Sequence, residues 1–166
     1  MALRHSLEDL REMAEVHVHY ELTHMALWSR MVTRDAKVNQ ALLEAYLTHV
    51  RNMHEFLTRR REKAYPDAVV AEDFFDEPWA LSIDVLTVAQ IDDIHRRLSH
   101  LSTGRLQRNT PHGGPFDWAG NHRLDRWARK VLKALGVFIG ELDTRHSERA
   151  AWFKPSYAEV QSFLRS

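Results

Sequence analysis

Hydrophobic residues recur every three or four positions through four long segments of the chain, a spacing that places them on one face of an α-helix. The segments span about residues 3–32, 36–61, 87–104 and 118–144. The pattern predicts four long amphipathic helices. Their apolar stripes are, in chain order, Leu3, Leu7, Leu10, Ala14, Val18, Met25 and Val32; Leu42, Leu43, Tyr46, Val50, Met53 and Leu57; Ile91, Ile94, Leu98 and Leu101; and Leu124, Trp127, Val131, Leu135, Phe138 and Leu142.

The ends of these segments carry residues that are typical of helix caps. Thr87 and Gln90 have the spacing of a capping box, in which both side chains accept hydrogen bonds from backbone N–H groups. Gly104 is a typical C-terminal stop. The cations of RRREK, at 59–63, suit the end of the second helix because the helix dipole favours positive charge there. A last short helix is expected from Ser156, which begins another capping box.

Four long amphipathic helices joined by short links favour an all-α fold. We expect an antiparallel four-helix bundle with a short fifth C-terminal helix packed across one end, in a single domain of residues 1–166. The segment AVVAEDFF, at 68–75, has enough apolar residues to dock on the bundle. The loop at 107–118 is either a plain connector or a lid over a site.

The chain has no net charge, with 23 basic and 23 acidic residues. This balance argues against binding to nucleic acid through overall charge, although it allows a local basic patch. It also gives little repulsion between copies, which suits a homodimer. The absence of cysteine excludes disulfides, thiolate-bound zinc and cysteine nucleophiles, and fits a cytoplasmic protein. No secretory signal or membrane-spanning run is visible, so no membrane partner is expected.

Eleven histidines raise the question of a metal site. Ferritin-like bundles bind metal ions through Glu-x-x-His pairs, and Glu21 and His24 have this spacing, with His17 on the same face. Glu44 and Glu141 are candidates for the remaining carboxylates. A carboxylate–histidine metal-binding bundle, ferritin-like or DinB-like, is therefore one alternative for the function. The plainer interpretation pairs His17 and His24 with Glu21 or water, and then no cofactor is expected.

A row of polar residues also runs along the second helix at i, i+4, i+7 and i+11, formed by Glu44, Thr48, Arg51 and Glu55. His49 and Asn52 lie between this row and the apolar stripe. One interpretation is a solvated face with helix ion pairs. The other is that Arg51 points into a cleft and meets a phosphate or carboxylate, which its planar guanidinium binds through two hydrogen bonds.

Three stretches resemble a group of uncharacterised bacterial all-helical proteins: HYELTHMA (19–26), LLEAYLTHVRNMHEFL (42–57) with AVVAEDFF after it, and IDDIHRRLSHLSTGR (91–105). The resemblance covers about residues 15–105 and brings no function with it. The first block of the family pattern is matched by Glu44, His49, Arg51, Asn52 and Phe56, and the second by Ser99, His100, Leu101, Ser102 and Arg105.

More distantly, the third helix is similar to the HEPN superfamily, all-α domains of toxins and phage-defence proteins. Active members are metal-independent ribonucleases that dimerise and carry Arg-x(4–6)-His in a composite cleft. The resemblance implies that His100 transfers protons for attack by a ribose 2′-hydroxyl while an arginine stabilises the phosphorane. The chain departs from the motif, since only three residues separate Arg96 from His100. Arg51 and Arg105 are possible substitutes, and an exposed polar helix face explains the same residues without catalysis.

The sequence therefore predicts a HEPN-like domain of a bacterial defence or toxin–antitoxin system that binds RNA and, as an enzyme, cleaves it without metal. The alternatives are a non-catalytic dimerisation or binding module and the metal-binding bundle. The expected catalytic residues are His100, Arg51, Arg96, Arg105 and Glu44. The expected substrate-binding residues are His49, Asn52 and Arg97. The metal alternative uses Glu21, His24 and His17.

Overall fold

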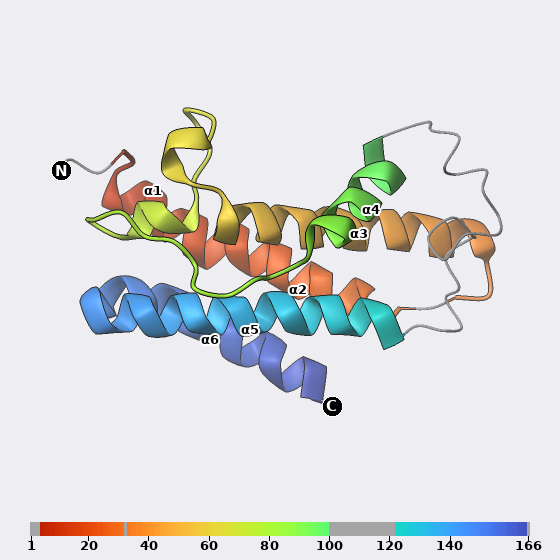
Figure 1. Ribbon diagram of the computed structural model, residues 1–166. Coiled ribbons are helices and arrows are strands. Elements are labelled where there is room, and N and C mark those ends of the chain that lie inside the picture. Colours follow the sequence, from red (N-terminus) through yellow and green to blue (C-terminus); the bar gives the residue numbers. More distant parts are fainter. Residues whose placement is uncertain (1–3, 32, 100–121, 166) are drawn as a thin grey trace.

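The computed structural model describes residues 4–31, 33–99 and 122–165 of the chain (Figure 1). Throughout these ranges the regular structure is helical and contains no strand, so the expected all-α class is confirmed. None of the described helices is long and apolar enough to cross a membrane. The elements are α1 (Leu7–Glu12), the π-helix η1 (Met13–Val18), α2 (His19–Trp28), α3 (Ala36–Thr58), the 3₁₀ turns η2 (Arg61–Lys63) and η3 (Ala71–Phe74), α4 (Val88–Ser99), α5 (His122–Arg145) and α6 (Ser147–Arg165).

The first predicted helix contains a π-helical stretch, which keeps its apolar residues in register. Leu10, Ala14, Val18 and Leu22 are spaced by four and are all buried. In an ideal α-helix, each step of four residues turns about 40° past a full revolution. Three such steps lead from Leu10 to Leu22, and in an ideal α-helix they would rotate Leu22 about 120° away from Leu10 and off the core face. The wider π turns of η1, with their i→i+5 hydrogen bonds, compensate for this drift.

Helix α3 begins at a polar cap and buries most of its predicted stripe. The Asp35 carboxylate accepts hydrogen bonds from the backbone N–H groups of Lys37 (2.8 Å) and Val38 (3.3 Å), which have no partner inside the helix. The chain turns extended at Arg59, which ends the helix. The residues of α3 that lie in the core are Leu43, Tyr46, Leu47, Val50, Met53, Phe56 and Leu57.

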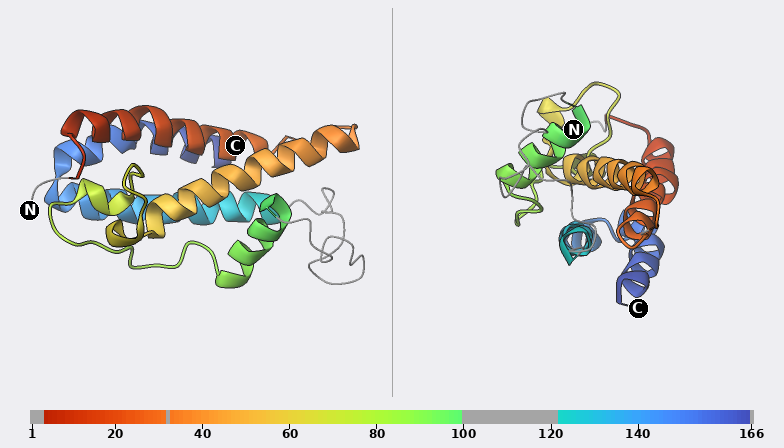
Figure 2. Two further views of the ribbon diagram at one scale, coloured as in Figure 1. Left: turned by 90° about the horizontal axis from the view of Figure 1, so that it is seen from above. Right: turned by 90° about the vertical axis from the view of Figure 1, so that its right-hand side faces the viewer.

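Four helices account for most of the packing. α2 packs against α3 and α6, and α5 packs against α6 and α3 (Figures 1 and 2). α5 and α6 are antiparallel, because His146 alone separates them. The predicted stripe of α5 is confirmed for Trp127, Val131, Leu135, Phe138 and Leu142, all of which are buried. α4 lies beside this group and packs on α3.

The predicted short C-terminal helix is wrong in both length and position. α6 begins at Ser147, runs through Pro155, and packs along α5 and α2 rather than across one end. Proline removes a helix hydrogen bond, but Pro155 and Ala151 are exposed, so water can reach the Ala151 carbonyl group. Ser156 is not a cap. It is buried, and its Oγ lies 3.0 Å from His19 Nδ1.

The predicted docking of residues 68–75 is confirmed, and the segment brings two carboxylates into the interior. Glu72 and Asp73 are only 5% and 2% exposed. Arg60 donates two hydrogen bonds to the Glu72 carboxylate, and Arg61 Nε donates to Asp73 (2.9 Å). Arg60 and Arg61, which were expected to stabilise the end of α3 through the helix dipole, therefore act chiefly as ion-pair partners of buried carboxylates. This pairing is what permits the burial of two charges.

The docked segment also adds aromatic side chains to the core. Phe74 and Phe75 are fully buried and contact Phe138 of α5 edge to face, with ring centroids 6.1 and 5.9 Å apart. Phe153 of α6 meets Phe74 at 4.9 Å in the same way. Trp79 stacks on Phe75. Edge-to-face contacts of this kind add to the stabilisation from burial, so the segment between α3 and α4 is a part of the core.

Candidate functional site

A buried histidine and a glutamate form the closest polar contact between α2 and α3. His49 Nδ1 donates a hydrogen bond to Glu21 Oε2 at 2.7 Å, and Asn52 Nδ2 donates to Oε1 of the same carboxylate at 3.1 Å. His49 is 8% exposed, whereas Glu21 is half-buried. Both carboxylate oxygens are occupied, so the Glu21 side chain is held in one orientation. Because the carboxylate can only accept, Nδ1 of His49 carries the proton of this hydrogen bond.

A second histidine stands beside this pair. The rings of His24 and His49 are 5.6 Å apart between centroids, and Tyr20 covers His24 at 4.0 Å. His24 Nδ1 lies 2.9 Å from the Tyr20 carbonyl oxygen, which can only accept. His24 therefore also holds its proton on Nδ1 and leaves Nε2 open. Tyr20 is exposed, so the edge of the cluster reaches solvent.

The cluster of Tyr20, Glu21, His24, His49 and Asn52 has the parts of a proton-transfer site. A carboxylate that accepts from Nδ1 orients an imidazole and stabilises its protonated form, and Nε2 can then take a proton from another group. The same arrangement also has a purely structural use, because it satisfies polar groups buried between two helices. The sequence pattern assigned Glu21 and His24 to the metal-binding hypothesis. It assigned His49 and Asn52 to substrate binding in the RNA hypothesis. The fold brings them together.

Glu44 and Arg51 lie on a different face of α3. At about 100° per residue, Arg51 is rotated roughly 200° from His49 and Glu44 roughly 220° in the same sense around the helix, so the two share a face away from His49. The Glu44 carboxylate accepts a hydrogen bond from Gln40 Nε2 at 2.8 Å. Arg51 is half-buried and has no hydrogen bond or ion pair within the described ranges. The carboxylate that contacts His49 is therefore Glu21, and Arg51 is left with its donors unused by any described acid.

Helix α4 packs directly on α3 and includes Arg96 and Arg97. The backbone of Arg96 and Arg97 lies in α4, but their side chains are outside the described part of the structure, as are His100 and Arg105 altogether. The predicted capping box is confirmed: Thr87 N donates to Gln90 Oε1 (3.0 Å), and Gln90 N donates to Thr87 Oγ1 (3.3 Å).

His54 of α3 faces α4, and its buried Nδ1 has no hydrogen-bond partner among the residues that the structure describes. Burial lowers the pKa of His54 below its ordinary 6.5, because the charged form loses solvation, and nearby His95 of α4 lowers it further. The adjacent Glu55 carboxylate acts in the opposite direction. His54 is therefore a neutral imidazole at neutral pH, held at the contact between α3 and α4.

The residues of the metal hypothesis do not form a ligand group. His17 is exposed on η1, and Glu21 already accepts from His49 and Asn52. Glu141 accepts hydrogen bonds from Trp79 Nε1 (2.6 Å) and Ser82 Oγ (3.2 Å). Across the described ranges, no group of three or more histidine, aspartate or glutamate side chains is arranged to hold a metal ion.

One charged feature was missed in the sequence. The outer face of α5 carries exposed basic residues over its first half, namely Arg126, Arg129, Lys130 and Lys133. The signal was present, since residues 122–140 contain only one acidic residue, Asp125. The overall charge of zero conceals this local excess of basic residues. Comparison of the chain with protein-family models, curated proteins and solved structures finds no match.

Proposed function

We propose that this protein is a HEPN-like helical domain of a bacterial defence or toxin–antitoxin system that binds RNA and cleaves it without a metal ion. The observation that carries the proposal is Arg51. A half-buried arginine loses part of its hydration and normally regains hydrogen bonds from an acid or a carbonyl group. Arg51 has no such partner in the described ranges. An RNA phosphate supplies the two acceptors that a guanidinium fits.

The packing of α4 on α3 supports the same assignment. α4 ends at Ser99, and His100 follows it directly in the chain. In the proposed reaction, His100 takes the proton of a ribose 2′-hydroxyl as the oxygen attacks the adjacent phosphorus. The bond to the 5′-oxygen then breaks, and that oxygen is protonated as it leaves. Arginines stabilise the negative charge that develops on phosphate. Arg51, Arg96 and Arg105 are the candidates for this role, with Arg97 in substrate binding.

His49 is a second candidate for the proton-transfer group, on a specific observation. Its Nδ1 hydrogen bond to Glu21, at 2.7 Å, gives it the orientation and the paired carboxylate that a general base needs. Asn52 then holds the carboxylate in place. In this version, Glu21 is the residue that orients the histidine.

The proposal includes an assembly and a location. We propose that α2, α3, α5 and α6 form an antiparallel four-helix bundle, that α4 forms part of a face shared by two copies in a homodimer, and that the protein is cytoplasmic. A dimer would allow a composite cleft, and the absence of cysteine fits a reducing compartment. Light scattering coupled to size-exclusion chromatography measures the mass directly. A monomer over the micromolar range would contradict the dimer.

The test is RNA cleavage in the presence of EDTA. Purified protein is incubated with a labelled single-stranded RNA of mixed sequence, and the variants His100→Ala, His49→Ala and Arg51→Gln are compared with His17→Ala, an exposed histidine, as control. Loss of a general acid or base lowers the rate by about 100-fold or more. Loss in His100→Ala or in His49→Ala identifies the proton-transfer group. Cleavage abolished by EDTA would contradict the metal-free mechanism, and RNA binding without cleavage would leave a non-catalytic binding module.

A further inference from the structure

The first half of α5 presents a continuous basic stripe to solvent. Arg126, Arg129, Lys130 and Lys133 are all exposed. Their positions fall within an arc of about 100° on the helix, opposite the buried face. Asp125 is the only acidic residue between 122 and 140. In a chain of zero net charge, this stripe is a local positive field of the kind that attracts polyanions.

The stripe is mounted on a rigid helix that contacts the first turn of α4. The inner face of α5 is packed into the core through Trp127, Val131 and Leu135, so the positions of the cations are fixed relative to one another. Lys130 Nζ donates a hydrogen bond to Gln90 Oε1 (3.3 Å), in the first turn of α4. The stripe therefore adjoins the helix that leads to His100.

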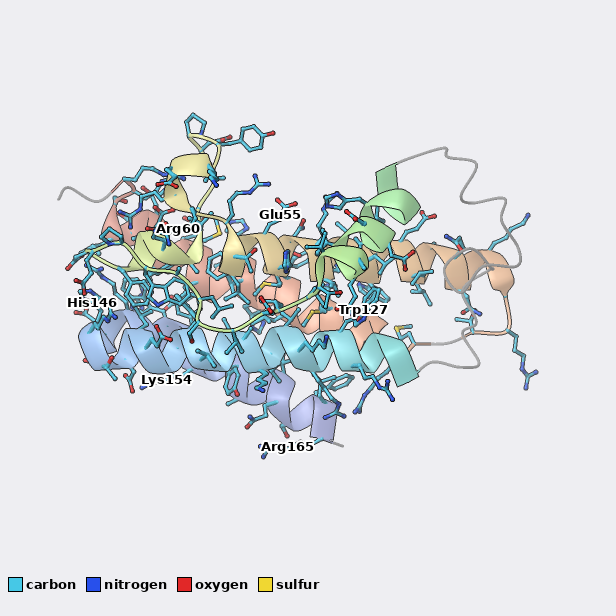
Figure 3. The ribbon with its side chains drawn as sticks, in the orientation of Figure 1. Glu55, Arg60, Trp127, His146, Lys154 and Arg165 are labelled. Atoms are coloured by element: carbon cyan, nitrogen blue, oxygen red, sulfur yellow. The ribbon has the colours of Figure 1, made fainter. Side chains whose placement is uncertain are left out.

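A groove of about 520 Å³ runs beside the stripe, between α5 and α6. Lys133 lies along its α5 side, and Arg165, at the end of α6, lines it as well (Figure 3). Gly136 and the half-buried Tyr157 also line it, and Tyr157 Oη accepts a hydrogen bond from Gln161 (3.1 Å). None of the described residues that line the groove is acidic. The groove thus combines cations at its edges with an aromatic ring inside.

We propose that the α5 stripe and this groove bind single-stranded RNA, with phosphates on the stripe and one base in the groove against Tyr157. The inference rests on the proposed function and names the surface that holds the substrate. Arg126 to Lys133 spans about 10 Å at 1.5 Å per residue. One strand of a helical nucleic acid carries about three phosphates over this length. Aromatic rings beside basic grooves bind single strands by stacking on bases, whereas a duplex hides its bases.

Other polyanions fit this surface less well. A helix that lies on an anionic membrane inserts large apolar side chains, and among the side chains described between residues 126 and 140 the outer face of α5 offers only Val137, which is half-buried. An acidic protein would pair with the cations of the stripe, but these ion pairs do not involve the groove beside it. RNA uses both features together.

The binding test measures fluorescence anisotropy of a labelled 20-nucleotide single-stranded RNA at several salt concentrations. The double variant Arg126→Gln/Lys133→Gln removes two exposed cations that form no hydrogen bond or ion pair with the other described residues. We expect the Kd to rise about tenfold, and the slope of log Kd against log salt to fall by about 1.4, since each phosphate contact on a single strand contributes about 0.7. The matched control is Arg11→Gln/Lys154→Gln, which removes two exposed cations elsewhere.

The groove has its own variant. Tyr157→Leu should weaken binding by about tenfold through lost stacking while leaving the salt slope unchanged, and its far-UV circular dichroism must match that of the wild type. Unchanged affinity and slope in the stripe variant would overturn the assignment of this surface, and the proposed function would survive if cleavage still depended on His100 or His49. A wild-type protein that binds no RNA would overturn both. Equal losses of RNA affinity in the stripe variant and in the control would show that positive charge anywhere on the surface attracts the RNA. That result would also overturn the assignment.

Discussion

The Nδ1 atom of His49 lies 2.7 Å from Oε2 of Glu21, and this hydrogen bond joins α3 to α2 in the interior of the interface. Asn52 supports the pair from one helical turn along α3. The contact is a candidate acid–base site, and it is also a structural contact whose contribution to stability can be measured independently of any activity.

Replacement of Glu21 by Ala should destabilise the fold. His49 Nδ1 and the Asn52 amide would lose their acceptor while remaining partly or fully buried, which costs about 1–3 kcal/mol. Urea denaturation followed by circular dichroism measures the change. The control is Glu15→Ala, whose carboxylate pairs with Arg11 on the surface and should change stability by less than about 0.5 kcal/mol. Equal effects of the two substitutions would contradict a special role for the α2–α3 contact.

Glycines one turn apart on α5 should respond oppositely to alanine. A Cβ atom at Gly136 would lie 2.7 Å from Tyr157 Oη, so Gly136→Ala forces Tyr157 to move and should cost about 1–3 kcal/mol. At Gly140 a Cβ atom meets nothing within 4 Å. Gly140→Ala should therefore stabilise the helix by about 0.5–1 kcal/mol. Thermal denaturation of the two variants gives the comparison, and stabilisation by both would show that Tyr157 moves freely.

The Glu72 carboxylate should make the fold sensitive to acid. Burial alone raises the pKa of Glu72, but hydrogen bonds from the backbone N–H groups of Arg61 and Trp79, together with the Arg60 guanidinium, outweigh it and hold the pKa below the ordinary 4.5. Because the folded pKa is the lower one, this contribution is present above pH 4.5 and is lost as the pH falls through the folded pKa. Urea denaturation between pH 6 and pH 3 should show a smaller loss in Glu72→Gln than in the wild type. Parallel curves would contradict the assignment.

His54 should make the stability of the fold depend on pH in a second, less acidic range. Burial lowers its pKa below 6.5, so the unfolded chain takes up a proton near pH 6.5 that the folded chain resists. Stability should therefore decrease as the pH falls below 6.5. His54→Leu removes the titrating group and leaves no donor or acceptor unpaired, because Nδ1 has no hydrogen bond. We expect a flatter stability curve between pH 7.5 and pH 5 for this variant, and an unchanged slope would disprove the role of His54.

Hydrophobic periodicity was sufficient to locate the helices, because a helix that packs on one side must carry apolar residues at intervals of three and four. The α4 capping box was equally predictable, since both of its partners lie within one turn. The start of α6 was not. Pro155 and the Ser156–Glu159 spacing mimic a helix start, and the pairing of Ser156 with His19 involves a residue 137 positions away in the chain.

The candidate site was likewise predictable from the sequence only in part. Sequence spacing selected Glu21, His24, His49 and Asn52, but it assigned them to separate hypotheses because it cannot show which faces of two helices meet. It also selected Glu44 as a catalytic residue, and Glu44 contacts Gln40 on another face of α3. Arg51, which the sequence left as either a solvated residue or one facing a cleft, is half-buried on α3, and its role stays a proposal.

The sequence by itself determined the helical class, the N-terminal cap of α4, the core stripes of α3 and α5, and the apolar character of residues 68–75, because each depends on residues close together in the chain. Only the tertiary structure decided that Glu21 accepts from His49, that Arg60 and Arg61 neutralise Glu72 and Asp73, and that the cations of α5 border a groove beside Tyr157. These contacts join residues on different elements. Their distances are set by how the helices pack, and a one-dimensional pattern does not encode that packing directly.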